Sequence, residues 1–105
     1  MATTITGANL PEVARITLNG TANLATKVIV PNYITRCSVA AIANDAKVAF
    51  SGTDGSAIGS TYVTVPAGSM LELSMVDGIG ESTRIGAIYV ASATSSSVVE
   101  VVVEG

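Results

Sequence analysis

Histidine and tryptophan are absent from this chain of 105 residues, and cysteine occurs only once, as Cys37. Without an imidazole the chain has no ordinary Ser-His or Cys-His nucleophile pair, no histidine acid or base and no histidine metal ligand. A single thiol excludes an internal disulfide and a cysteine-based zinc site. We therefore expect no enzyme activity, no catalytic residue, no bound metal and no cofactor.

Charge is also scarce. Charged residues make up 12% of the chain, and the net charge is −3, whereas soluble domains contain roughly 25% charged residues. Five scattered cations cannot form the basic stripe of a nucleic-acid-binding protein. The first residues lack the basic and apolar regions of a secretory signal, and no window approaches the ~18 apolar residues of a membrane span. We expect a protein made in a reducing cytoplasm, with neither nucleic acid nor a membrane as its partner.

What the chain does contain is a large share of β-branched residues. There are 14 Val, 9 Ile and 12 Thr, which together make up one third of the sequence. These side chains favour strands because their branching restricts them in helices. The hydrophobic share of 49% excludes a disordered chain. The composition therefore predicts an all-β protein.

Short apolar segments follow one another from Val13 onward, separated by turn residues at intervals of about 8–14 residues. Strands are expected at residues 13–18, 25–30, 33–43, 46–51, 60–65, 70–75, 84–91 and 97–104. Residues 36–47 also have the composition of an alanine-rich helix, but their period of two favours a strand. We predict a two-sheet antiparallel sandwich of about eight strands, jelly-roll-like, over residues 13–105. Residues 1–12 are expected to form an extended N-terminal arm.

Several strands are apolar on both faces. The alternation directs Val99, Val101 and Val103 inward, as it does Phe50 and Val63, yet it leaves further apolar side chains on the outer faces. In a small sandwich, the partner for such an outer face is expected to be another copy of the chain. The residues predicted to form this subunit interface are Tyr62, Met70, Tyr89, Val98 and Val102.

The remaining chemical groups have simple structural interpretations. Cys37 lies on the apolar side of its segment and is expected to be a small buried hydrophobe. Asp45, Asp54, Asp77 and Glu81 all fall in expected loops without the spacing of a calcium loop. They are interpreted as solvated turn carboxylates.

A resemblance to a known family is carried by the order of several short segments. In chain order these segments are Ile16-Thr17-Leu18-Asn19-Gly20-Thr21, Val28-Ile29-Val30-Pro31, Ala46-Lys47-Val48-Ala49-Phe50-Ser51-Gly52, Val65-Pro66-Ala67-Gly68-Ser69 and Ile88-Tyr89-Val90-Ala91-Ser92, and a Val/Glu strand closes the chain. This order resembles the small virion structural proteins of tailed bacteriophages, in particular head decoration (cement) proteins. The resemblance spans residues 13–105.

The resemblance implies a structural role. Such proteins typically assemble as trimers on the outer surface of the capsid, where they clamp subunits of the major capsid protein. It suggests a capsid-binding arm with Thr3, Thr4, Ile5 and Leu10 as the candidate residues, although the sequence leaves open whether the arm contacts the capsid or a sister subunit. It also implies that the protein resides on the virion surface after synthesis in the host cytoplasm. One alternative is another phage component, such as a head fibre, tail or adaptor protein. A carbohydrate-binding module is a further alternative, with Tyr33, Tyr62 and Tyr89 as the available aromatics.

Overall fold

A computed structural model describes residues 2–5, 11–30, 36–74 and 86–104 of the chain. Regular structure in this part consists of strands, and it includes no helix long and apolar enough to cross a membrane. The strands are β1 (Thr3–Thr4), β2 (Glu12–Thr17), β3 (Thr26–Ile29), β4 (Arg36–Ala41), β5 (Ala46–Ala49), β6 (Val63–Val65), β7 (Met70–Ser74), β8 (Ala87–Ala91) and β9 (Val98–Glu104).

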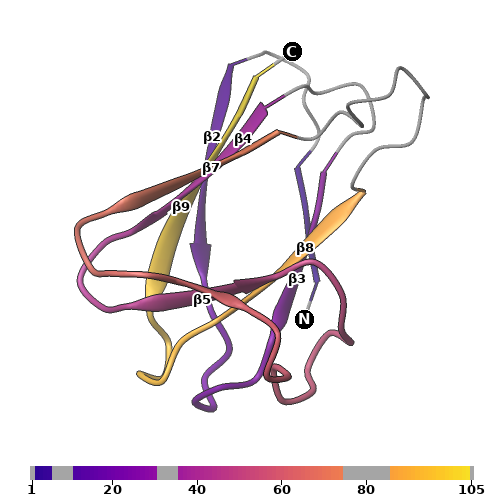
Figure 1. Cartoon of the computed structure of the whole chain (residues 1–105), viewed down its shortest axis with the longest axis vertical. Coiled ribbons are helices and arrows are strands. Elements are labelled where there is room, and N and C mark those ends of the chain that lie inside the picture. Colours follow the sequence, from indigo (N-terminus) through magenta and orange to yellow (C-terminus); the bar gives the residue numbers. More distant parts are fainter. Residues whose placement is uncertain (1, 6–10, 31–35, 75–85, 105) are drawn as a thin grey trace.

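The strands pair in a nested order. β2 pairs with β9, β3 with β8, β4 with β7 and β5 with β6, all antiparallel. The chain is thus one long hairpin that has been rolled up, and further pairing of β4 with β9 and of β5 with β8 closes it into two sheets. Their strand orders are β1-β3-β8-β5-β6 and β2-β9-β4-β7 (Figure 1). Nested pairing of eight strands in two sheets is the topology of a jelly roll, which confirms the predicted fold class.

The core lies between the two sheets and consists of small side chains. Val99, Val101 and Val103 on β9 face Val28 on β3 and Ile88 on β8 within one cluster of buried residues. All five are at most 1% exposed. Full burial of one such side chain contributes about 1.5–3 kcal/mol. Strict alternation along β9 therefore sets which of its faces joins the core, as the sequence predicted.

The beginning of the chain belongs to the five-stranded sheet. β1 runs parallel to β3, with Thr3 opposite Val28 and Thr4 opposite Ile29. The N–H of Ile5 donates to the carbonyl oxygen of Ile29 at 2.8 Å. The Ile5 side chain is 2% exposed and packs in the core. Residues 3–5 of the predicted arm are therefore part of the sandwich, and Ile5 is not a surface residue.

The rest of the β3 edge is covered by the loop after β5. The N–H of Lys27 donates to Oδ1 of Asp54 at 2.9 Å. Ala25 exchanges backbone hydrogen bonds with this loop, donating to Ser56 and accepting from Gly55, both at 2.8 Å. β1 and residues 54–56 therefore cover the side of β3 that faces away from β8, and β3 is an interior strand of its sheet.

A tight turn carries the chain from the five-stranded to the four-stranded sheet. The N–H of Ser69 donates to the carbonyl oxygen of Pro66 at 2.9 Å, and Gly68 has a φ of 81°. A positive φ at the third residue defines a type II turn and favours glycine there. This turn places β7 directly after β6 but in the opposite sheet.

Two inward positions were predicted wrongly. Phe50 is 48% exposed and Val63 is 44% exposed. β5 ends at Ala49, so Phe50 already belongs to the loop and no longer follows the alternation of the strand. Val63 is the first residue of β6, the edge strand of its sheet, and the opposite sheet does not cover it. Residues 33–35, 75 and 84–85 of the expected strands lie outside the described residues.

Candidate functional site: the outer face of the four-stranded sheet

The predicted interface residues lie on two faces that point away from each other. Tyr89 alternates with the core residues of β8, and Tyr62 lies beside Lys47 of β5, so both rings belong to the outer face of the five-stranded sheet. Val98 and Val102 alternate with the core residues of β9 on the outer face of the four-stranded sheet. Met70 shares this second face. The structure thus brings together the residues of β7 and β9 and separates them from the two tyrosines.

Cross-strand rows show what surrounds Val98, Val102 and Met70. One row runs Val13, Val102, Ser38, Glu72, and the next runs Arg15, Glu100, Ala40, Met70. Val13 is 63% exposed, Ile42 43% and Met70 56%. Together with Val98, Val102 and Ala40 they form a surface that we call the outer apolar face: Val13, Ala40, Ile42, Met70, Val98 and Val102.

Val13 and Ile42 were not predicted to belong to this face. The alternation along the strands does direct both side chains outward: Val13 alternates as Arg15 and Thr17 do, and Ile42 alternates opposite to Val39 and Ala41. What the sequence does not contain is the pairing of β2 with β9 and of β9 with β4. That pairing makes neighbours of residues that are far apart in the chain.

Charged side chains divide and border the outer apolar face. Arg15 and Glu100 form an ion pair of 2.6 Å between Nη2 and Oε2 in the row between Val98 and Val102. At one end of the face, Arg36 lies between Glu72 and Glu104, at 3.8 and 3.5 Å. Exposed ion pairs of this kind each contribute about 0.2–1 kcal/mol to folding. These pairs also set the pattern of charge on this face.

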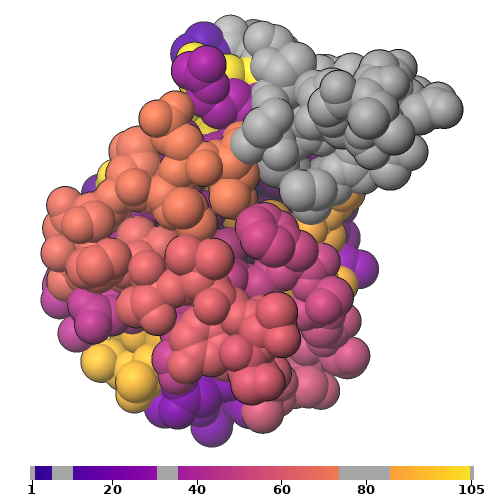
Figure 2. All heavy atoms as spheres, in the orientation of Figure 1, coloured from indigo at the N-terminus to yellow at the C-terminus, as the bar shows by residue number. Residues whose placement is uncertain are grey.

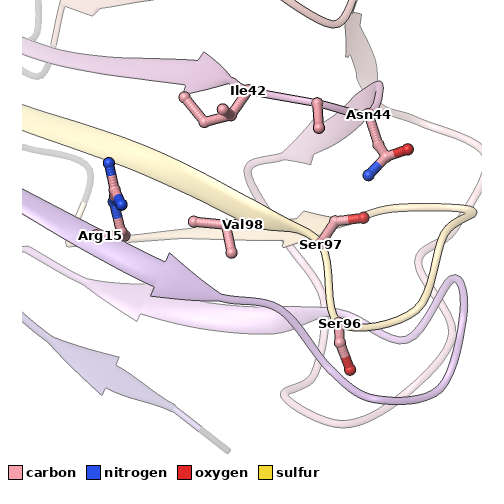
Figure 3. A pocket seen from close by; sticks show the side chains of 7 residues that line it. Arg15, Ile42, Asn44, Ser96, Ser97 and Val98 are labelled. Carbon is pink, nitrogen blue, oxygen red and sulfur yellow. The ribbon is translucent and has the colours of Figure 1, made fainter.

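A hollow of about 390 Å³ opens at one end of the outer apolar face. Ile42 at the end of β4, Val98 on β9 and Arg15 on β2 approach it from three strands (Figure 3). Its remaining lining comes from two turns and consists of Ala43, Asn44, Ser96 and Ser97. The hollow combines two apolar walls with amide, hydroxyl and guanidinium groups. This lining contains no pair of groups suited to acid–base or nucleophilic catalysis.

The Cys37 thiol is buried and the Asp54 carboxylate is hydrogen-bonded to the backbone. Cys37 is fully buried, and burial raises the pKa of its thiol to about 11, so it stays protonated at neutral pH. The hydrogen bond from the Lys27 N–H lowers the pKa of the Asp54 carboxyl. The described part of the chain brings together no group of three potential metal ligands. Asp77 and Glu81 lie outside it.

Other residues of the chain contact the rings of Tyr62 and Tyr89 on the opposite face. Nζ of Lys47 lies 5.0 Å from the centre of the Tyr62 ring and also donates to Oδ1 of Asn23 at 3.0 Å. A side chain built on Gly52 would come within 3.5 Å of the Tyr89 ring, because the loop after β5 passes close to it. Stacking of a sugar needs an open ring face. These contacts therefore give no support to the carbohydrate-binding alternative, and Tyr33 lies outside the described residues.

Three of the four residues predicted to bind a capsid are described, and they belong to the five-stranded sheet and its core. Thr3 and Thr4 form β1, and Ile5 is buried in the core. Leu10 lies outside the described residues. Of the four residues, only Thr4 is both described and well exposed.

No model of a known protein family matches this chain, and no curated protein sequence or solved structure matches it significantly. The resemblance to phage decoration proteins therefore remains an expectation from the sequence.

Proposed function

We propose that this chain is a non-catalytic structural protein that decorates the outer surface of a phage capsid by docking its outer apolar face onto the major capsid protein. The observation that carries this proposal is the exposure of Val13, Ile42 and Met70 on one sheet face. Large apolar side chains gathered on one face of a soluble domain are typical of an interaction surface.

The energetics favour a rigid docking surface. Complete burial of an exposed Val, Ile or Met contributes about 1.5–3 kcal/mol. Association opposes this gain with the loss of translational and rotational freedom, and with the ordering of any flexible segment. A paired sheet is already ordered, so the second cost is small here. Many copies bound to one shell need only modest affinity each when every copy contacts several capsid subunits.

The test is binding to shells in solution. Purified chain is mixed with expanded empty shells of the major capsid protein that is encoded with it, and the bound fraction is measured after sedimentation. We expect saturation at a fixed ratio to capsid subunits. Ile42→Lys and Met70→Lys, which place a charge on the outer apolar face, are expected to reduce binding at least tenfold.

Val63→Lys is the matched control, because Val63 is similarly exposed but lies in the other sheet. It is expected to bind as well as the parent. The proposal fails if shells take up none of the parent chain, or if the three variants bind equally well. Negative-stain labelling of tails or fibres instead of shells would support the alternative of another phage component.

A further inference from the structure

Within the described part of the chain, no further strand pairs with either edge of the four-stranded sheet. Its edge strands are β2 and β7, and among the described residues each of them pairs on one side only, β2 with β9 and β7 with β4. β3 of the other sheet differs, because β1 and residues 54–56 cover the side of it that faces away from β8. In Figure 2 the segment from β6 to β7, drawn in salmon to orange, lies at the front of the molecule. Open edges of this kind are templates for pairing with another chain.

The hydrogen-bonding direction along β2 follows from one contact. The N–H of Leu18 donates to the carbonyl oxygen of Ser97 at 2.7 Å, so the backbone groups of Leu18 point toward β9. Backbone groups of successive residues in an antiparallel strand alternate in direction. Val13, Arg15 and Thr17 therefore direct their N–H and C=O groups toward the open edge, and their side chains lie on the outer face, all exposed.

The same reasoning applies to β7. The N–H of Ala41 donates to the carbonyl oxygen of Ser69 at 3.0 Å, so residues with the parity of Ser69 point toward β4. Met70 and Glu72 have the other parity and direct their backbone groups toward the open edge. Their side chains are exposed and lie on the same outer face as those of β2.

The two edges carry opposite charges. Arg15 is central in β2 with a side chain that is 71% exposed, and Glu72 is central in β7 with a side chain that is 66% exposed. Pairing β2 with another β2 in the central register would place two arginines opposite each other, which is unfavourable. Pairing β2 with β7 would instead join the existing ion pairs into a series of alternating charges: Glu100 with Arg15, then Glu72 with Arg36 of the next copy. Such a pattern favours one pairing and disfavours the other.

We infer that copies of this chain associate head to tail, with β2 of one copy pairing antiparallel to β7 of the next. In this register, Arg15 lies opposite Glu72 of the next copy, and Thr17 lies opposite Met70 of the next copy. The four-stranded sheets of successive copies then form one continuous sheet. A heterologous contact of this type closes into a ring of at least three copies or forms an open row. The inference does not depend on capsid binding, since it concerns backbone pairing at the two edge strands, although Val13 and Met70 of the outer apolar face lie on these strands.

The first test is the mass of the purified protein, measured by native mass spectrometry and light scattering at micromolar concentration. We expect assemblies of three or more copies. Arg15→Glu and Glu72→Arg are each expected to lower the mass to that of one chain, with an unchanged β circular dichroism spectrum. The double variant, with both changes in every chain, restores the complementary pair and is expected to reassemble.

Glu104→Arg is the control, because it changes a charge on the same face within β9, which is an interior strand. It is expected to leave the mass unchanged. A parent protein that is a monomer or a simple dimer would overturn the inference, as would single variants with the mass of the parent.

The second test checks the register. Residues in a hydrogen-bonded antiparallel pair have Cα atoms about 5.5 Å apart, which a disulfide can span. Thr17→Cys combined with Met70→Cys is therefore expected to cross-link into multimers on oxidation. The same two positions within one chain are separated by β9 and β4, a distance of about 14 Å. Thr17→Cys with Glu72→Cys is out of register and serves as the control. If the first pair gives no more multimers than the control, the proposed register is wrong.

Discussion

Neighbouring valines on β9 offer a direct test of which sheet face is buried. Val101 is fully buried, whereas Val102 is half-buried on the outer face. Val→Thr keeps the shape of the side chain but replaces a methyl group with a hydroxyl. A hydroxyl at position 101 would lie between the two sheets among apolar side chains, and leaving it unsatisfied costs about 1–3 kcal/mol. At position 102 the hydroxyl reaches solvent, and the expected change is within about 0.5 kcal/mol.

The assay is thermal and urea unfolding followed by circular dichroism. For a domain of this size, 2 kcal/mol lowers Tm by roughly 10 °C, so the two variants are easily distinguished. Protein concentration must be equal in all samples, because assembly shifts Tm by mass action. Val99→Thr and Val98→Thr repeat the comparison one step along the same strand. Equal losses for the inward and outward members of both pairs would refute the assigned faces of β9.

Three further predictions concern single residues. The Cys37 thiol, buried and with a pKa of about 11, is expected to resist alkylation in the folded protein and to react only on unfolding, as a mass shift with iodoacetamide would show; rapid labelling of the native protein would contradict its burial. Gly68→Ala forces a side chain into a φ of 81° with open space around it, and we expect a loss of about 1 kcal/mol from backbone strain alone, measured by urea unfolding; an unchanged midpoint would argue against the type II turn. Because the pKa of Asp54 is lowered in the folded state, its contribution to stability is present at neutral pH and is lost as the pH falls below about 4. Asp54→Asn should therefore lower the urea midpoint at pH 7, and the difference from the parent should shrink near pH 3; a constant difference would exclude this linkage.

Much of the fold was predictable because the hydrophobic pattern has a period of two. The alternation in β9 and β2 requires a strand with one buried face, and any register slip by one residue would expose Val99, Val101 and Val103. The same pattern distinguished a strand from an alanine-rich helix at Arg36–Ala41. Alternation failed at Phe50 and Val63, because it does not indicate where a strand ends or how far the opposite sheet extends.

The candidate site was only partly predictable. The parity of each segment identifies an outward side chain, but it does not tell which of the two sheets that side chain belongs to. Tyr62 and Tyr89 were grouped with Val98 and Val102 for this reason, although they lie on opposite sides of the sandwich. Ile5, expected in an extended arm, is held in the core by a parallel pairing with β3 that no local pattern indicates.

By itself, the sequence determined the class of the protein: a β-rich chain without histidine and with a single cysteine, whose alternating strands must bury one face. These are properties of composition and of neighbours along the chain, and they hold before any two strands meet. Only the tertiary structure decided that β2 and β7 are the edges of one sheet, and that their central charges are opposite in sign. Sheet order depends on contacts between residues that are distant in sequence, and no pattern along a single strand specifies them.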